Sequence, residues 1–183
     1  GFEIPNTVKY IGDEAFVGCE MLYEIELPQS VEHIGESLFE GCGNLYIVKL
    51  SDSLKNIGKR TFAECYHLDS LVIPKSVETI GGGAFEKCFN LGKIEIPASV
   101  SKIEKSAFYN SELEVDSANL FYASVDGALY NKAKDTLVYC PGEKLSFSIP
   151  ETVVHVEEKA FATCKYLASI IIPNSVKSIG KET

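Results

Sequence analysis

The sequence predicts a solenoid in which short parallel β-strands stack from coil to coil. Three observations lead to this fold class: a repeat of 23 residues, apolar residues held in fixed columns of that repeat, and strand-like stretches of alternating polarity within each copy. A fixed period of roughly 20 to 29 residues is typical of solenoids, because each unit buries its apolar side only against its neighbours.

The columns give the repeat its frame. Most copies open on a proline, and the proline column comprises Pro5, Pro28, Pro74, Pro97, Pro150 and Pro173. The phenylalanine column is complete and comprises Phe16, Phe39, Phe62, Phe85, Phe108 and Phe161. We expect this apolar column to be buried between neighbouring copies.

Each copy contains three expected elements. Residues 30–35, "SVEHIG", form a short extended segment that ends at a glycine. Residues 13–19, "DEAFVGC", place Ala15, Phe16 and Cys19 on one side of a single turn of α- or 3₁₀-helix. Residues 22–28, "LYEIELP", alternate apolar and polar side chains, which predicts a strand ended by proline.

One copy is irregular. The distance from Phe108 to Phe161 is 53 residues, which leaves room for one longer copy at residues 119–148. Asp126-Gly127 is a turn signal between alternating runs, so we expect a β-hairpin in place of the helical segment. This coil is interpreted as a structural variation first, and as a contact site for a partner second.

Composition bounds the function. The 183 residues include 45% hydrophobic and 23% charged side chains, as expected for a single domain over residues 1–183. The net charge of −9 and the absence of a basic cluster argue against nucleic acid and anionic membranes as partners. No apolar run approaches a membrane span, so we expect no direct membrane insertion. Because the chain starts in a strand-like stretch and stops inside a copy, we expect a fragment of a longer protein.

The cysteines follow the repeat. Cys19, Cys42, Cys65 and Cys88 are one period apart, Cys164 holds the same phase, and only Cys140 lies off the pattern. Thiols in phase with a core pattern are expected to be small buried hydrophobes rather than an extracellular disulfide framework. The spacings do not match a zinc site, and no metal or other cofactor is predicted.

The outward positions of the expected strands line up as rows on one surface. These candidate binding residues are Glu24, Ile47, Ser70, Lys93 and Ser169 in one row, and Glu26, Lys49, Val72, Glu95 and Ile171 in the next. Such a mixture of apolar and charged residues is typical of protein-binding surfaces. The same mixture also fits strand positions that are only exposed to solvent.

Two further columns predict how the coils are held in register. Lys9, Glu32, Lys55 and Glu78 alternate in sign at one phase, so each charge is expected beside opposite ones. An unbroken column of small hydroxyl residues is expected to bond backbone groups after each proline. Its members are Thr7, Ser30, Ser53, Ser76, Ser99, Thr152 and Ser175.

No catalytic constellation is found, and the chain is predicted not to be an enzyme. His33 and His155 share a phase but lie five coils apart, and His67 has another phase. A catalytic or metal site requires convergent groups, which these histidines cannot provide. The segment "GGGAF" at residues 81–85 lacks the GxxxxGK pattern of a phosphate-binding loop.

With these columns, the chain resembles the BspA-like, or Treponema-type, leucine-rich repeats of cell-surface proteins. The shared pattern, "IPxSVxxIGxxAFxxCxxLxxIxI", is met almost completely in "IPKSVETIGGGAFEKCFNLGKIEI". The resemblance covers essentially the whole chain, and "VDGALYN" is also similar to hairpin copies of that family. It implies a right-handed curved superhelix of about eight coils. Its parallel β-sheet would lie on the concave face, its short helical or 3₁₀ turns on the convex face, and one coil would carry the hairpin.

The resemblance also implies a function and a location. It implies secretion or surface display, and adhesion through the concave sheet to a host, extracellular-matrix or other extracellular protein, or to a glycan. The alternative is a structural spacer that displays another domain or assembles with itself. End-to-end association is considered because Phe2, Ile4 and Ile179 lie in coils at the two ends.

Overall fold

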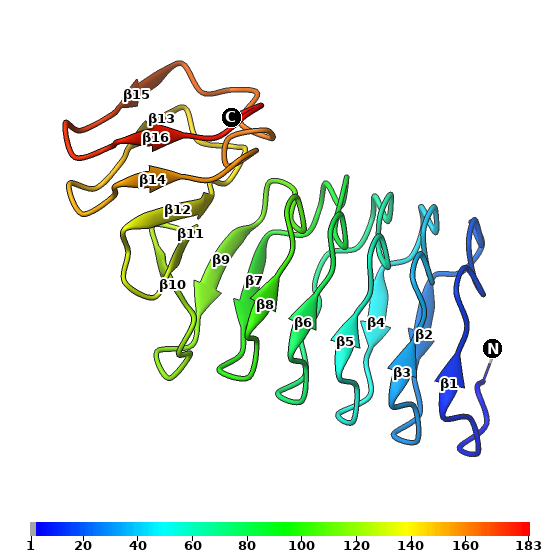
Figure 1. The fold of residues 1–183 in the computed structure, drawn as a ribbon. Coiled ribbons are helices and arrows are strands. Elements are labelled where there is room, and N and C mark those ends of the chain that lie inside the picture. Colours follow the sequence, from blue (N-terminus) through cyan, green and yellow to red (C-terminus); the bar gives the residue numbers. More distant parts are fainter. Residues whose placement is uncertain (1–2) are drawn as a thin grey trace.

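The chain is a β-solenoid of parallel strands, as the repeat predicts. A computed structural model describes residues 3–183 (Figure 1); Phe2 therefore lies outside the described residues. Most regular coils carry a short strand, a turn region and a second strand on the other side of the core. Because all coils follow the same path, equivalent strands of successive coils lie beside one another.

The first series of strands is called the short-strand row. It contains β1 (Tyr10–Ile11), β3 (His33–Ile34), β5 (Asn56–Ile57), β6 (Thr79–Ile80), β8 (Lys102–Ile103), β14 (His155–Val156) and β16 (Ser178–Ile179). Hydrogen-bonded neighbours are parallel and one repeat apart, as in the pairing of Thr79 with Lys102. In β3 the polar residue is exposed and the isoleucine is buried, so half of each strand faces the core.

The second series lies on the opposite side of the core, and its exposed side is called the strand face. Its members are β2 (Glu24–Glu26), β4 (Ile47–Lys49), β7 (Lys93–Ile96), β9 (Glu112–Val115), β13 (Ser146–Ser148) and β15 (Ser169–Ile171). In the third coil Ser70 forms only an isolated parallel bridge with Ile47. The central residues, such as Ile25 and Val48, are buried, as alternation predicts.

The expected helical turns are wrong, because residues 3–183 contain no helix. The segment around Phe16 is instead a series of tight turns with left-handed residues on both sides, at Glu14 (φ 57°) and Gly18 (φ 67°). A helix needs consecutive residues with negative φ, and only three residues separate these two. The Phe16 N–H donates to Leu38 O at 3.0 Å in the next coil, while the N–H groups of Val17 and Cys19 close local turns onto Glu14 O and Phe16 O.

The phenylalanine column forms a stack of rings through the core. Adjacent ring centroids are 5.5 to 5.7 Å apart from Phe16 to Phe108, with planes within 16° of parallel. The stack continues onto Tyr139, whose centroid lies 5.8 Å from that of Phe108. Phe39, Phe62 and Phe85 are completely buried, so the stack is the centre of the core.

The cysteine column lies beside the ring stack and bonds successive coils. The Sγ of Cys65 donates to Phe39 O at 3.2 Å, and the Sγ of Cys88 donates to Phe62 O at 3.0 Å. Cys42, Cys65, Cys88 and Cys140 are buried, Cys164 is half-buried and Cys19 is exposed in the first coil. All six thiols are free. A thiol therefore suits this column because it fills a small apolar space and also satisfies a buried carbonyl.

The hydroxyl column partly performs the predicted role. Ser30 Oγ donates to Val8 O and Ser76 Oγ donates to Leu54 O, both at 2.7 Å and both across one coil. Ser99 Oγ and Ser175 Oγ are buried without a hydrogen-bond partner. The column therefore links some coils after the proline and leaves others without this bond.

The irregular coil contains the predicted hairpin. β10 (Tyr122–Val125) and β11 (Ala128–Asn131) are antiparallel around Asp126-Gly127, and β12 (Thr136–Tyr139) pairs antiparallel with β11. The buried Asn119 anchors this hairpin coil to the preceding coil. Its Nδ2 donates to Pro97 O and Val100 O at 2.9 Å, and its Oδ1 accepts the N–H groups of Phe121 and Tyr122.

The hairpin coil divides the core into two parts. Leu129 and Tyr139 pack with the coils that carry β1 to β9, which we call the N-terminal stack. Tyr130 and Leu137 pack with the coils that carry β13 to β16, which we call the C-terminal stack. Strand direction changes at this coil: the strands of the two stacks run along different directions in Figure 1. The N-terminal stack advances along a nearly straight path, so most of the curvature is located at the hairpin coil.

Candidate binding surface

The predicted rows of outward residues exist on the strand face. Glu24 pairs with Ile47, Glu26 pairs with Lys49, and Ile47 forms the bridge with Ser70. All ten candidate residues are exposed. They are Glu24, Ile47, Ser70, Lys93 and Ser169, and Glu26, Lys49, Val72, Glu95 and Ile171. The solenoid does not bring all ten together, because the hairpin coil separates Ser169 and Ile171 from the other eight.

Two acidic residues of the strand face were missed by the sequence reasoning. β9 pairs with β7 in parallel, which places Glu112 beside Lys93 and Glu114 beside Glu95. This copy is shorter than 23 residues, so a fixed period does not find these positions. The signal that could have found them is the alternation of "ELEV" itself. Ser146 and Ser148 were missed for a related reason, since they pair with Ser169 and Ile171 directly after the irregular copy.

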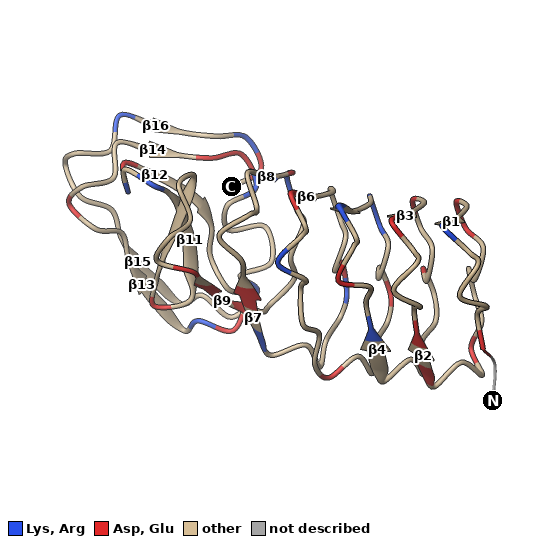
Figure 2. Cartoon of the chain, turned by 90° about the horizontal axis from the view of Figure 1, so that it is seen from below, with Lys and Arg blue, Asp and Glu red and all other residues tan. Residues whose placement is uncertain are grey.

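The strand face has an acidic character with an apolar centre. Ion pairs join Lys49 Nζ to Glu26 Oε2 at 3.0 Å, and Lys93 to Glu114. The Glu114 carboxylate, by hydrogen bonding, raises the pKa of Lys93. In Figure 2 the strands β2, β7 and β9 carry acidic residues in red, and β4 carries a basic residue in blue. Since acidic residues outnumber basic ones on these strands, the face keeps a negative charge.

Two carboxylates on this face lack an ion-pair partner within residues 3–183. They are Glu24 on β2 and Glu95 on β7, which lie on either side of the second and third coils. Between them Val72 is 82% exposed and Ile47 is 44% exposed. The face therefore presents apolar side chains between two carboxylates that have no ion pair within 4.0 Å.

Both strand rows are interrupted where the two stacks meet, and a cleft opens on one side. β8 pairs with β6 only, whereas β12 pairs with β11 and β14. The cleft between them has a volume of about 640 Å³ and is lined by residues of both stacks and of the hairpin coil. The free edge of β8 is partly closed by Tyr122, whose hydroxyl accepts the Ile103 N–H at 2.9 Å. Such closure protects an exposed strand edge.

Side chains connect the two stacks across their junction. Lys105 Nζ lies 2.8 Å from Glu158 Oε2. The hydrogen bond between them raises the pKa of Lys105 and lowers the pKa of Glu158. On another side of the junction a second cleft of about 470 Å³ includes Lys144, which pairs with Glu112 at 3.1 Å. These ion pairs lie at the surface of the junction, where such pairs are individually weak.

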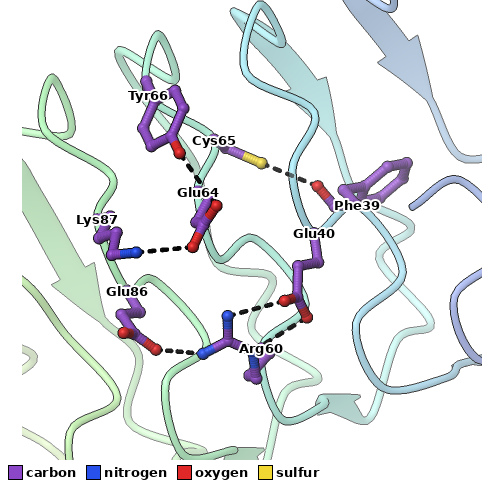
Figure 3. A network of polar contacts seen from close by, with 8 residues as sticks. All are labelled: Phe39, Glu40, Arg60, Glu64, Cys65, Tyr66, Glu86 and Lys87. Atoms are coloured by element: carbon purple, nitrogen blue, oxygen red, sulfur yellow. Dashed lines mark hydrogen bonds and ion pairs between the residues drawn. The ribbon is translucent and has the colours of Figure 1, made fainter. Parts of the chain in front are cut away.

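The turn side of the solenoid carries a denser charge network (Figure 3). Arg60 donates two hydrogen bonds to Glu40, at 2.8 and 3.0 Å, and a further one to Glu86, so it joins three coils. Lys87 Nζ similarly pairs with Glu64 at 2.7 Å. The hydrogen bond from Arg60 lowers the pKa of Glu40, against the opposing effect of burial. These pairs link adjacent coils on the turn side.

The predicted charge ladder is partly confirmed. Lys9 lies 4.0 Å from Glu32, and Lys55 lies 3.7 Å from Glu78. The central step, from Glu32 to Lys55, has no ion pair within 4.0 Å. The ladder thus works as separate pairs of adjacent coils.

The histidines take part in local contacts. His67 Nδ1 contacts Gly43 O and His155 Nδ1 contacts Ser178 Oγ, both at 2.7 Å and both between adjacent coils. Within residues 3–183 no group of three or more His, Cys, Asp or Glu side chains has an arrangement that could hold a metal ion. No helix in the same residues is long and apolar enough to cross a membrane.

Comparison with protein families gives one match. The family described as the BspA type leucine rich repeat region matches the chain in six copies, over residues 1–114 and 136–183. The unmatched residues between these ranges contain the β10–β11 hairpin. No curated protein matches the chain.

Solved structures of bacterial proteins have a similar fold. A leucine-rich repeat protein from Eubacterium ventriosum is 28% identical with a TM-score of 0.83, over 94% of this chain and 47% of that chain. A leucine rich cell surface protein from Faecalibacterium prausnitzii is 31% identical with a TM-score of 0.71, over 97% of this chain and 56% of that one. The leucine rich repeat protein of T. pallidum is 28% identical with a TM-score of 0.60, over 94% and 67% of the two chains. The chain spans about half the length of the first two proteins.

Proposed function

Because the chain belongs to the BspA-type leucine-rich repeat family, we propose that it is a non-enzymatic module that binds a macromolecular partner on its strand face. The observation that carries this function is the row of exposed side chains on adjacent parallel strands, from Glu24 to Glu114. A protein partner suits this surface, because Ile47 and Val72 offer apolar contact area beside charged residues.

In this function the module is displayed on a bacterial surface or secreted. It adheres to a host protein or another extracellular protein, and a glycan is the alternative partner. Surface display is supported by the similar Faecalibacterium protein, which is named a cell surface protein. Repeat solenoids commonly use such extended surfaces for recognition. The negative charge of −9 is unfavourable for nucleic acid and anionic lipid as partners.

A binding array tests this function. The folded monomer is applied to extracellular-matrix proteins, serum proteins and glycans, together with the variant Glu24→Lys/Lys49→Glu/Glu95→Lys. Glu14→Lys is the matched control, since it changes the net charge equally on the turn side, where Lys159 occupies the same phase. Saturable binding that is lost in the triple variant and kept in the control supports the strand face. Binding that persists in the triple variant contradicts it.

The second candidate function is a spacer that assembles end to end. It rests on the repeat itself, because each coil of a solenoid buries its apolar side against a neighbouring coil. Ile179 of β16 occupies a core-facing column and is 51% exposed. Sedimentation velocity at increasing protein concentration tests this function. A growing fraction of dimers and longer species, reduced by Ile179→Lys, supports it, and a monomer at all concentrations contradicts it.

A further inference from the structure

The two carboxylates of the strand face that make no ion pair define the chemistry of a partner. Glu24 and Glu95 have no ion pair within 4.0 Å in the described residues, whereas the other acidic residues of β2 and β9 are paired with lysines. The nearest cation to Glu95 on its own strand, Lys93, is paired with Glu114 and feels Glu95 only through longer-range electrostatic attraction. Burying an unpaired carboxylate against a neutral or acidic surface is unfavourable, because its hydration is lost without compensation. A partner that covers this face must therefore offer cations at these two positions.

The spacing of the two carboxylates follows from the strand register. Glu24 and Glu95 are three coils apart, and Glu95 lies in the second of the two rows. With strands about 4.8 Å apart and two residues spanning about 7 Å, the separation is about 16 Å. Two lysines four residues apart on an extended chain are about 13 Å apart at their backbones, and their flexible side chains cover the remaining distance.

The residues between Glu24 and Glu95 determine which kind of side chain the partner should carry between its two cations. Val72 is 82% exposed, and Ile47 is exposed beside it in the neighbouring coil. An apolar side chain two residues from each lysine points to the same side of an extended segment as both lysines. It would cover Val72 and Ile47 and thereby gain burial of apolar surface on binding.

We infer that the partner presents an extended basic-apolar-basic segment of the type Lys-x-Leu-x-Lys, which lies across β2, β4 and β7. This inference rests on the proposed function, because it assigns a partner chemistry to the same strand face. The net charge of −9 adds long-range attraction for such a segment and accelerates its association at low ionic strength.

Three immobilised peptides test the inference directly. They carry the sequence motifs Lys-x-Leu-x-Lys, Glu-x-Leu-x-Glu and Lys-x-Ser-x-Lys, with x as threonine or serine, and the folded monomer is the analyte in biolayer interferometry. We expect saturable binding to the first peptide, at least tenfold weaker binding to the third and none to the second. Binding to the first should weaken as sodium chloride rises from about 50 to about 300 mM.

Matched variants locate the binding on the strand face. Glu24→Gln/Glu95→Gln keeps the shape and removes both charges, and it should weaken binding about 5- to 30-fold. Glu14→Gln/Glu36→Gln removes two exposed charges from the turn side and should leave binding unchanged. Equal binding of the acidic and basic peptides, or full binding by Glu24→Gln/Glu95→Gln, would overturn the inference.

The two proposals fail separately. If the array yields a binder that needs Glu24, Lys49 and Glu95 but the basic peptide does not bind, the partner chemistry is wrong and the strand-face function stands. If the array binders ignore every strand-face substitution and the basic peptide also fails to bind, both are wrong. Specific binding of the basic peptide with its loss in Glu24→Gln/Glu95→Gln supports both.

Discussion

Replacing Phe62 with alanine should lower the free energy of unfolding by about 4–6 kcal/mol. Phe62 is completely buried, and its ring lies between Phe39 at 5.5 Å and Phe85 at 5.6 Å. Truncation of a buried phenylalanine costs about 3–5 kcal/mol, because apolar contacts are lost and a cavity remains. Each lost aromatic pair adds about 0.5–1.5 kcal/mol, part of which is already included in the truncation cost.

Two further variants separate burial from stacking. Phe62→Leu keeps an apolar side chain but removes both ring pairs, so it should cost about 1.5–3 kcal/mol. Phe16→Ala removes a partly exposed ring of the first coil that stacks on Phe39, and it should cost about 2–3 kcal/mol. The expected order of destabilisation is therefore Phe62→Ala, then Phe16→Ala and Phe62→Leu.

Urea unfolding followed by far-ultraviolet circular dichroism gives the three free energies, with size-exclusion chromatography to establish that each variant is monomeric. If Phe16→Ala cost as much as Phe62→Ala, the depth of a ring in the stack would not determine its contribution. If Phe62→Leu cost as much as Phe62→Ala, burial of apolar surface would not be the main term. Either result would refute the reasoning from the ring stack.

Three other predictions concern polar groups. Asn119→Leu should cost about 2–4 kcal/mol in urea unfolding, because four backbone groups lose their partner; an unchanged midpoint would show that the hairpin coil does not depend on it. Burial raises the pKa of Cys42 to about 11, so at pH 8 a thiol reagent should modify the exposed Cys19 and spare Cys42. Mass spectrometry of the modified peptides measures this difference, and rapid modification of both thiols would contradict the burial of the cysteine column. Arg60→Met should cost about 1–2 kcal/mol at pH 7 and progressively less below about pH 4.5. The sign follows because Arg60 lowers the pKa of Glu40 in the folded state, so this stabilisation is present above the ordinary glutamate pKa and is lost as Glu40 protonates. If Arg60→Met cost the same at pH 7 and at pH 3, this ion pair would be excluded as the source of the cost.

The fold was predictable because the columns of the repeat are physical positions. The complete phenylalanine column predicted apolar side chains buried between coils, and the alternation around Ile25 predicted which side of the strand is buried. The helical turns were predicted wrongly because the spacing of Ala15, Phe16 and Cys19 fits a helix but says nothing about φ. The signal for left-handed residues was present in the sequence, at Gly18 and in the third glycine of "GGGAF", which has a φ of 65°.

The irregular copy limited what the sequence could predict about the candidate site. Cys140 appears off the pattern, yet its N–H donates to Ala160 O as the Phe85 N–H donates to Ala107 O in a regular coil. Cys140 thus occupies a phenylalanine position, while the ring of Tyr139 continues the stack. A periodic count could not place Glu112 either, because the coil before the hairpin is shortened. Whether Glu24 and Glu95 are unpaired depends on side-chain reach across coils, which the sequence does not specify.

Because the hairpin coil divides the core, the length of the solenoid and the direction of its strands depend on different coils. Each regular coil adds about 4.8 Å to a stack without turning it much, so gain or loss of a repeat changes how far the solenoid extends. The hairpin coil instead changes the direction of the strands (Figure 1). Reach and direction can therefore vary independently in evolution, by duplicating regular coils in one case and by altering residues such as Asn119 and Tyr139 in the other.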